Sequence, residues 1–387
     1  MNPVPAFYDR LRVLLKNGPF PLAYVDLASF DQNADSLAKR AQPYPIRVAS
    51  KSLRCVELTQ RVLKHPAYRG VLAYRGFEAV ELVRRGIDDV VVAYPVVNTV
   101  ELDAVADHAR SITLMTDRPE HLEWLHAVAE AKKIEFSIAV DLDVSSRWPG
   151  VFFGVRRSWI SSEARLEQYL TALKKFPRLK LVGAMGYEAQ IAGVSDRGAL
   201  MRFLKSRSIQ DVLRIRRLRV EQIRAAGHAL RFVNGGGTGS LESSREDPVI
   251  TEVSAGSGLY QSTLFDDYRA FQSPPSAGFV LEVTRKPEAQ IVTCFSGGYL
   301  ASGSVGFEKQ PTPVDPPGLS LLKHEGAGEV QTPLQGAGAS SLQIGDLVFF
   351  RHAKAGELCE RFNELSMISG DGVQKTLTYR GEGWNFG

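Results

Sequence analysis

The sequence contains few cysteines, no long apolar run and no dense block of basic residues. Its three cysteines, Cys55, Cys294 and Cys359, lie far apart and form no C-x-x-C pair, which is typical of a reduced, cytoplasmic protein. The first twenty residues lack an unbroken apolar stretch, and no window approaches the length of a membrane span, so we expect neither a signal peptide nor a transmembrane helix. The formal charge of +4 is mild, so nucleic acid is not an expected partner.

What the chain does contain is a long alternation of apolar strands and helical segments over residues 21–268. This pattern favours parallel strands joined by crossover helices. Eight or nine such units in roughly 250 residues fit a (β/α)₈ barrel. The expected strands cover residues 21–26, 46–50, 70–74, 89–94, 111–116, 136–143, 181–187, 230–236 and 250–256.

The remainder of the chain has a different character. From Gly278 onward, runs rich in Val, Thr and Phe alternate with turns rich in Gly and Pro, which predicts a β domain. The prolines of 310–318 predict a loop there, because proline cannot donate to a strand ladder. We therefore predict an α/β protein with a TIM-type barrel at 21–268 and a β domain formed by 1–20 plus 269–387.

One expected helix, within residues 199–227, is rich in arginine. Its charges are interleaved with Leu, Ile and Val at helical spacing. This pattern predicts a solvated helix on the outside of the barrel rather than a nucleic-acid surface.

A lysine stands where the second expected strand ends. Catalytic groups of such barrels lie at the carboxyl ends of the strands. A lysine that is desolvated there loses preference for its charged form and becomes a nucleophile. The alternative is that Lys51 merely begins an exposed helix, and its position alone favours neither. The polar residues at the strand ends are Asp26, Lys51, Tyr74, Arg75, Tyr94, Asp141, Asp143, Tyr187, Glu188, Gln190 and Asn234.

Two glycine-rich segments, Asn234–Ser240 (NGGGTGS) and Ser254–Tyr260 (SAGSGLY), follow the last two expected strands. Glycines let successive backbone N–H groups converge on an anion, and Thr and Ser hydroxyls add donors. Barrels of this type bind phosphate on their last loops. Neither segment is a Walker A motif, and ordinary tight turns also use these residues. A reactive lysine combined with a phosphate site indicates pyridoxal phosphate.

The segment RVASKSLRC (47–55) resembles the lysine-bearing strand end of fold-type III pyridoxal-phosphate enzymes, the alanine-racemase-like barrels. Within them, the chain is most similar to the D-serine dehydratase and D-threonine aldolase group. The resemblance covers nearly the whole chain in order. Its matching pieces are PLAYVDLASFDQNA, ASK, GVLAYRGFEAVEL, DDVVVAYPVV, VDLDVSSRWPG, GAMGYEAQIAG, NGGGTGS, TEVSAGS and GDLVFF, with His352 nearby.

The resemblance implies roles for individual residues. Lys51 would bind the cofactor covalently, and Tyr187 would lie near its ring. Asp143 and Arg147 come from a segment similar to the family's D-x-G-x-x-R-x-G, here altered to DVSSRWPG. The implied catalytic residues are Lys51, Tyr187 and His352. The implied cofactor-binding residues are Lys51, Arg147, Tyr187, Asn234, Gly236, Gly237, Thr238, Gly256 and Ser257.

The resemblance also implies a divalent metal such as zinc, manganese or magnesium, held by a His-x-Cys or His-x-Asp pair in the C-terminal domain. Here His352 is followed by Lys354 at the second position. Cys359 could complete the site if the loop folds back, as could Glu357 or Glu360. We expect His352 and Cys359 as metal ligands. The alternative is a metal-free loop in which His352 and Lys354 bind the substrate.

These features predict a lyase acting on D-β-hydroxy-amino acids. Aldolase-type cleavage of the Cα–Cβ bond is the first choice, followed by a D-serine or D-threonine dehydratase. An amino-acid racemase, with Tyr299 as its second acid or base, and a non-catalytic carrier of pyridoxal phosphate are further alternatives. By resemblance, we also expect a homodimer.

Overall fold

The computed structural model describes residues 5–304 and 306–386 of the 387-residue chain. It divides into two compact units. The barrel unit comprises Leu37–Lys51, Thr59–Gly256 and Phe386–Gly387, and the sheet unit comprises Met1–Ser36, Ser52–Leu58 and Ser257–Asn385. Within the described residues, no helix combines the length and hydropathy needed to cross a membrane.

The barrel unit is built on eight strands that close on themselves in the order β10-β11-β2-β3-β4-β5-β6-β9. Every neighbouring pair is parallel. The predicted TIM-type barrel is therefore confirmed. Its strands are β2 (Ile46–Ala49), β3 (Tyr68–Ala73), β4 (Val90–Val92), β5 (Ile112–Thr116), β6 (Phe136–Asp141), β9 (Leu179–Met185), β10 (Phe232–Gly235) and β11 (Glu252–Ala255).

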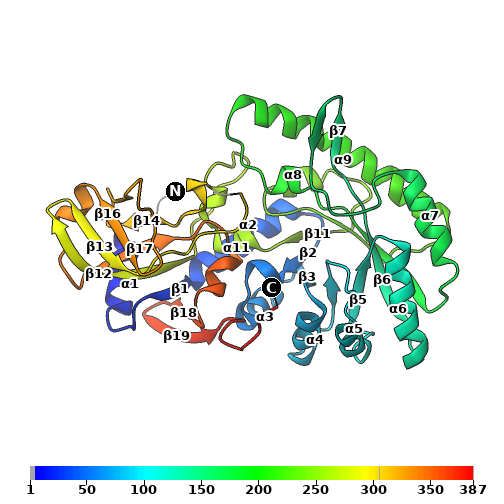
Figure 1. The fold of residues 1–387 in the computed structure, drawn as a ribbon, viewed down its shortest axis with the longest axis horizontal. Coiled ribbons are helices and arrows are strands. Elements are labelled where there is room, and N and C mark those ends of the chain that lie inside the picture. The colour runs from blue at the N-terminus through cyan, green and yellow to red at the C-terminus, as the bar shows by residue number, and fades with distance from the viewer. Residues whose placement is uncertain (1–4, 305, 387) are drawn as a thin grey trace. The chain divides into compact units, whose positions relative to one another are not determined.

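Helices connect these strands and cover their outer side, as Figure 1 shows for α4 to α7. Two of them begin at residues whose side chains accept a backbone hydrogen bond, Asn98 from the N–H of Glu101 and Ser162 from that of Arg165. The connecting elements are the turn η1 (Ser50–Ser52) and the helices α2 (Leu27–Ala41), α3 (Val56–Leu63), α4 (Gly76–Arg84), α5 (Thr99–Ala106), α6 (Pro119–Lys132), α7 (Glu163–Leu173), α8 (Ala189–Ala192), α9 (Ala199–Ala225) and α10 (Leu241–Ser244).

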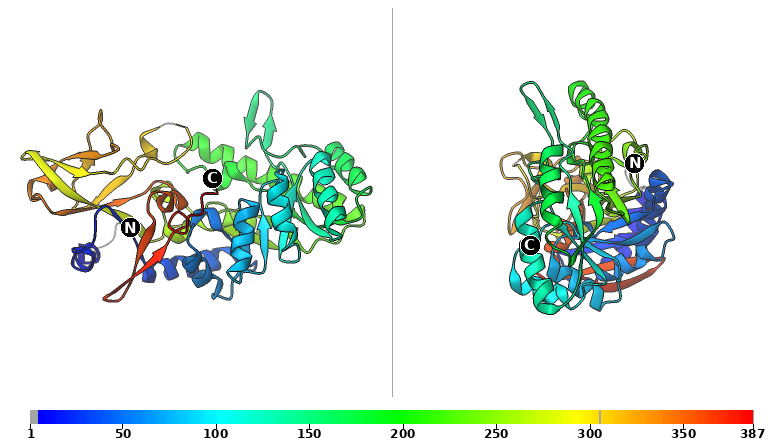
Figure 2. Two further views of the ribbon diagram at one scale, coloured as in Figure 1. Left: turned by 60° about the horizontal axis from the view of Figure 1, so that its bottom comes forward. Right: turned by 90° about the vertical axis from the view of Figure 1, so that its right-hand side faces the viewer.

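A hairpin of two short strands, β7 (Ser146–Trp148) and β8 (Val151–Phe153), follows β6. It projects from the barrel unit beyond the helices (Figure 2). The hairpin therefore belongs to the barrel unit without being part of its closed sheet.

The interior of the barrel is filled by side chains that alternate along its strands. One buried layer consists of Val91, Met115, Ala139, Met185 and Phe232, from five strands. Because strand residues alternate between the two faces, the residues two positions further along these strands face the interior again, closer to the carboxyl end. This layer fixes the register from which the site is built.

The sheet unit contains a mixed nine-stranded sheet. Along its main path the strand order is β15-β16-β13-β12-β1-β18-β19, and β17 pairs with both β12 and β14. Helix α1 (Pro5–Leu15) packs on this sheet through Tyr8, Leu11 and Leu15, and the Tyr8 ring lies 5.2 Å from that of Phe349.

The strands of this sheet are β1 (Leu22–Asp26), β12 (Ala277–Glu288), β13 (Ile291–Phe295), β14 (Thr312–Asp315), β15 (Ser320–Leu321), β16 (Gln331–Gln335), β17 (Leu347–Arg351), β18 (Glu364–Ser369) and β19 (Gly372–Leu377). The short helical elements are α11 (Ser257–Tyr260), η2 (Thr263–Phe265), η3 (Phe307–Lys309), η4 (Ala337–Ser340) and η5 (Gly356–Glu360). The predicted second, β-rich region is therefore confirmed.

Two local predictions were wrong. The strand expected first in the barrel, at 21–26, is β1, which pairs antiparallel with β12 and parallel with β18. The segment 310–318, expected as a loop, contains β14, where Pro313 opposes Phe350. Strand β14 has a partner on one side only, and an edge strand tolerates proline because one row of its N–H groups needs no partner in the sheet. The boundaries 21–268 and 1–20 plus 269–387 stay a prediction.

The barrel interior predicts a severe response at one glycine. Gly183 of β9 lies opposite Phe232 of β10, and a Cβ atom at Gly183 would stand 2.2 Å from the Phe232 ring. We expect Gly183→Ala to lower the free energy of unfolding by about 1–3 kcal/mol, because the ring must leave its position. Denaturant unfolding measures this. The control Gly372→Ala, whose Cβ meets only the carbonyl oxygen of Ser369 at 3.4 Å, should change little, and equal effects at both positions would contradict the account.

Candidate active site

The carboxyl ends of the barrel strands form one rim, because all eight strands are parallel. Ala139 and Met185 belong to the interior layer, so Asp141 and Tyr187, two positions further along, face inward at this rim. By the same alternation Asp117, the residue directly after β5, lies two positions beyond Met115. The sequence singled out Asp141 and Tyr187 but missed Asp117, whose position two residues after a buried methionine was the available signal.

Lys51 lies in η1 directly after β2. In the barrel, β2 neighbours β11, which neighbours β10. The glycine turn after β10 and Gly256, which directly follows β11, therefore share the rim with Lys51. The rest of the second segment forms helix α11 of the sheet unit. Adjacent strands are about 4.8 Å apart, which places the turn and Gly256 within about 10 Å of the end of β2. Lys51 is exposed, and its role as a nucleophile stays a prediction.

Each glycine of the first turn has its own physical reason. A Cβ atom at Gly235 would lie 2.9 Å from the Arg216 guanidinium. Gly236 has φ +85°, which other residues rarely adopt. A Cβ atom at Gly237 would lie 2.6 Å from that of Ala192 and 3.2 Å from the Tyr187 ring. The turn thus approaches two helical segments and Tyr187 more closely than any larger residue allows.

The backbone donors of this turn are not equivalent. The N–H of Gly236 donates to the Glu188 carboxylate at 3.0 and 3.1 Å. Gly236 was expected among the phosphate-binding residues; its N–H is engaged by Glu188, and a contact with phosphate stays a prediction. The N–H of Gly237 has no hydrogen-bond acceptor among residues 5–304 and 306–386. Thr238 is buried, and its carbonyl oxygen accepts a hydrogen bond from Arg40.

The same carboxylate ties the turn to a buried arginine. Arg216 of α9, fully buried, bonds Glu188 at 2.8 Å and Asp247 at 2.6 Å. Arg219 on this helix is also buried. The prediction of a solvated outer helix was therefore wrong at these two positions. Their spacing from Val212, Val220 and Ile223, all buried, places them on the inner stripe of the helix, and that spacing was a signal in the sequence.

Asn234 lies inside the barrel, where both ends of its amide are engaged. Its Nδ2 donates to Glu252 at 2.8 Å, and its Oδ1 accepts from the Ser254 hydroxyl at 3.0 Å. Glu252 in turn pairs with Arg47 at 2.7 Å. This interior network links β2, β10 and β11, the three strands that carry Lys51 and the glycine turns. Contact of Asn234 with a cofactor stays a prediction.

The structure brings Tyr187 to the turn at Gly237 but gives Arg147 other partners. Burial raises the pKa of the Tyr187 phenol to about 12, and Glu188 adds to the rise, so the phenol keeps its proton at neutral pH. Arg147 lies on the β7–β8 hairpin, where it pairs with Asp143 at 2.5 Å and stacks near Phe152. Its side chain is half-exposed.

His352 and Cys359 belong to the sheet unit and both adjoin Tyr260. The His352 and Tyr260 rings meet edge to face, with centroids 6.2 Å apart, and the Cys359 sulfur lies 3.7 Å from the Tyr260 hydroxyl. Neither ring nitrogen of the buried His352 has a partner among the described residues. Burial lowers its pKa to about 3, helped by Arg351, so the imidazole is neutral. Gly256 ends the barrel unit and Ser257 begins the sheet unit.

Comparison with known proteins places this architecture. Residues 25–263 match the family model described as alanine racemase, N-terminal domain. The chain belongs to this family. A D-threonine aldolase of an Arthrobacter species is 24% identical over 262 residues, a match that spans 65% of this chain and 65% of that relative.

Two solved structures show the fold shared by this family member. D-threonine aldolase from Filomicrobium marinum superposes with a TM-score of 0.82 at 17% identity, covering 96% of this chain and 97% of that one. D-threo-3-hydroxyaspartate dehydratase from Delftia sp. HT23 gives 0.78 at 17% identity, covering 94% and 98%. The fold is thus the fold-type III architecture that the sequence predicted.

The alanine racemase N-terminal family implies pyridoxal phosphate, and the barrel rim of this member fits it. One rim carries an exposed lysine after β2 and, two strands away after β10, a tight glycine turn whose Gly237 N–H has no acceptor among the described residues. These are the groups needed to bind an aldehyde and a phosphate.

The expected metal fits less well in this family member. No group of three or more His, Cys, Asp or Glu side chains that could hold an ion occurs in the described part of the chain. Glu357 accepts a hydrogen bond from the N–H of Ser302 at 2.7 Å, and Glu360 pairs with Arg54. His352 and Cys359 remain, and two ligands fall short of the usual three or four. We therefore derive no step through a metal.

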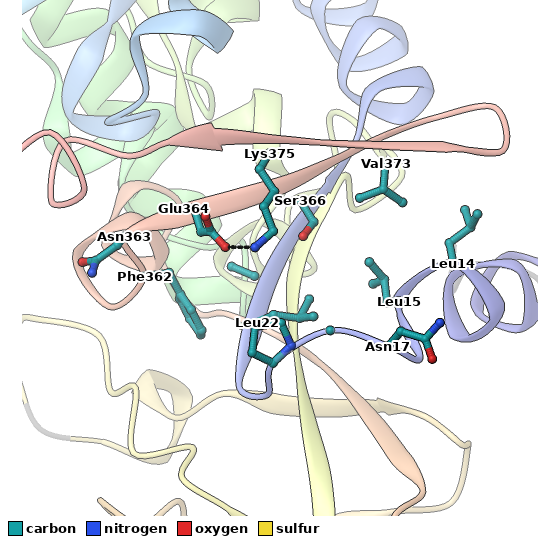
Figure 3. A pocket seen from close by; sticks show the side chains of 13 residues that line it. Leu14, Leu15, Asn17, Leu22, Phe362, Asn363, Glu364, Ser366, Val373 and Lys375 are labelled. Atoms are coloured by element: carbon teal, nitrogen blue, oxygen red, sulfur yellow. Dashed lines mark hydrogen bonds and ion pairs between the residues drawn. The ribbon is translucent and has the colours of Figure 1, made fainter.

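The sheet unit also contains a cavity of about 250 Å³, away from all predicted site residues (Figure 3). Leu14, Leu15 and Leu22 form its apolar wall, and the ion pair of Lys375 with Glu364 stands at one side. No residue of the barrel rim lines it. The cavity therefore adds nothing to the candidate active site.

Asp141 at the barrel rim gives this family member a pH-dependent group. Burial raises its pKa to about 8 from an ordinary value of 3.8, and Asp117 and Asp143 add to the rise while Arg157 opposes it. The folded state therefore holds this proton more tightly than the unfolded state. The resulting stability is complete below pH 3.8 and is lost as the pH rises through 8.

Between pH 5 and pH 9 the wild type should lose about 4 kcal/mol of unfolding free energy through Asp141, and Asp141→Asn, which cannot ionise, should not show this loss. Denaturant unfolding at the two pH values measures this difference. The exposed Asp103 provides a control, since Asp103→Asn should leave the pH dependence as in the wild type. Equal pH dependence in wild type and Asp141→Asn would contradict the assignment.

Proposed function

We propose that the chain is a pyridoxal-phosphate-dependent lyase that cleaves the Cα–Cβ bond of D-β-hydroxy-amino acids, giving glycine and an aldehyde. The observation that carries this proposal is the position of Lys51. It follows β2, which neighbours β11, and β11 neighbours β10, the strand that ends in the first glycine turn. One cofactor that carries an aldehyde and a phosphate can bind Lys51 and the glycine turn at the same time. The similarity to a D-threonine aldolase supports the class of reaction.

The residues of the rim would divide the work. When bound, the cofactor withdraws electrons from a bond at Cα of the amino acid. The Lys51 amine would hold the aldehyde carbon and return to it after the reaction. Tyr187, which keeps its proton at neutral pH, would donate a hydrogen bond near the ring rather than act as a base. The phosphate would be held by Gly237, Thr238, Gly256 and Ser257, with Gly236 shaping the turn.

A base is also needed to take the proton of the β-hydroxyl group. His352 is the proposed candidate, because neither of its ring nitrogens has a hydrogen-bond partner among the described residues. A pKa of about 3 makes the buried imidazole a weak base in the free protein, so the proposal requires that the bound substrate raise this pKa. Arg147, which pairs with Asp143, is the proposed contact for an acidic group of the cofactor or substrate. By the family resemblance, we also propose that the chain acts as a homodimer.

The second candidate is a dehydratase for D-serine or D-threonine. If the freed Lys51 amine takes the proton from Cα, the β-hydroxyl group leaves and a keto acid results. The shared fold with D-threo-3-hydroxyaspartate dehydratase favours this alternative over a racemase or a non-catalytic carrier. The β-rich sheet unit also argues against a carrier, since a barrel alone would bind the cofactor.

Absorption tests the cofactor. The purified protein with pyridoxal phosphate should show an absorption band in the visible range, because the lysine-bound cofactor absorbs visible light. In Lys51→Ala the absorbance of this band should be at least tenfold lower. Lys64→Ala, a change at another exposed lysine, should keep the band. A wild type without a band, or an unchanged band in Lys51→Ala, would refute the assignment of Lys51.

The products from D-threonine test the reaction. We expect glycine and acetaldehyde in equal amounts, whereas 2-oxobutanoate would indicate the dehydratase and an epimer the racemase. Treatment with a chelator should change the rate by less than about twofold, because the described part of the chain contains no group of three or more side chains that could hold an ion. Loss of activity on chelation with recovery on adding a divalent metal would restore the metal to His352 and Cys359.

A further inference from the structure

A fully buried arginine lies behind the first glycine turn of the barrel rim. Arg216 extends from α9 and donates to the Glu188 carboxylate at 2.8 Å, the Asp247 carboxylate at 2.6 Å and the carbonyl oxygen of Gly186 at 2.7 Å. The side chains of all three charged residues are at most 1% exposed. Two carboxylates and one guanidinium therefore share a site without solvent.

The Glu188 carboxylate connects this arginine to the turn. It accepts hydrogen bonds from the N–H of Gly236 at 3.0 and 3.1 Å, from the Ser240 hydroxyl at 3.2 Å and from the Ser244 hydroxyl. Gly236 itself is in the left-handed region, at φ +85°. The buried Glu188 carboxylate thus holds the turn in a backbone conformation that residues other than glycine rarely adopt.

The chain makes room for the arginine with two glycines. A Cβ atom at Gly186 would lie 3.3 Å from Arg216 Nε, and one at Gly235 would lie 2.9 Å from Arg216 Nη2. The first glycine of the NGGGTGS motif therefore serves the approach of Arg216. Within the motif, Gly235 leaves space for the Arg216 guanidinium, and Gly236 allows the turn at the rim.

We propose that Glu188, Arg216 and Asp247 are positioning residues that fix the 235–238 turn so that it binds the phosphate group of the cofactor. This inference rests on the proposed function. Glu188 takes the N–H of Gly236 and leaves the N–H of Gly237, which has no acceptor among the described residues, for the ligand. Arg216 keeps the Glu188 carboxylate in place and offsets part of the negative charge of the two carboxylates, which would otherwise oppose an anion in the turn.

Pyridoxal, which lacks the phosphate, separates this role from a general structural one. Both aldehydes bind Lys51, but only pyridoxal phosphate uses the turn. We expect Glu188→Gln and Arg216→Met to weaken binding of pyridoxal phosphate about tenfold or more, while binding of pyridoxal changes less than twofold. Dissociation constants are measured from the visible band of the lysine-bound compounds.

The chain offers a matched control and a mild variant. Arg217 is the next residue on α9, exposed and paired with Glu221, and Arg217→Met should change neither dissociation constant. Ser244→Ala removes one hydroxyl donor to Glu188 and leaves the ion pairs intact. It should weaken pyridoxal phosphate about threefold and pyridoxal not at all, even if Arg216→Met fails to fold.

Two results would overturn the inference alone. The first is that the Glu188 and Arg216 variants bind pyridoxal phosphate as tightly as the wild type does. The second is that they lose the same factor in affinity for pyridoxal phosphate and for pyridoxal. A wild type that binds neither compound would instead refute the proposed function, and the inference with it. A loss confined to the phosphate-bearing compound supports the positioning role.

Discussion

The candidate site depends on one constraint, the parallel closure of eight strands into a barrel. Because every pair of neighbouring strands is parallel, all strand ends of one kind lie on one rim. The order β10-β11-β2 then makes neighbours of three segments that are up to about 200 positions apart in the sequence. A lysine and two glycine turns become parts of one surface without any direct contact between them being required.

Polar groups inside the barrel unit stabilise this arrangement at a cost in desolvation. Arg47, Glu252 and Asn234 form a chain of hydrogen bonds across β2, β11 and β10. The Arg216 cluster does the same behind the turn. Removing one member of such a cluster leaves an unpaired buried charge, and this is costlier than replacing the whole cluster by apolar groups. These networks therefore account for the fixed positions of the strand ends and the glycine turn rather than for the overall stability of the fold.

The sequence predicted the barrel, its eight strands and the β-rich second unit, because hydrophobic periodicity reports which elements form. It could not assign β1 to its sheet, since the apolar run 22–26 suits either sheet and pairing with β12 is decided by tertiary packing. The role of Arg216 was likewise hidden. Its partners Glu188 and Asp247 lie 28 and 31 residues away, and an arginine among leucines on a helix ordinarily points to solvent.

Within the candidate site, the sequence located Lys51, Tyr187 and the glycine turns, because these motifs directly follow strands. It expected Gly236 among the phosphate-binding residues, whereas in the structure the N–H of Gly236 donates to the Glu188 carboxylate. No local pattern tells which N–H groups of a turn face outward. The sequence left Glu357 and Glu360 open as alternatives to Cys359 beside His352, and in the structure these two carboxylates bind Ser302 and Arg54. Side-chain partners across loops are set by the final packing and leave little trace in the sequence.

The central claim is that Lys51 carries the cofactor at this rim. Borohydride reduction of the protein loaded with pyridoxal phosphate makes the lysine attachment permanent, and peptide mass spectrometry then locates it. The account predicts a stoichiometric addition on the peptide that contains Lys51 and on no other. Addition at a different lysine, or none after full loading, would contradict it.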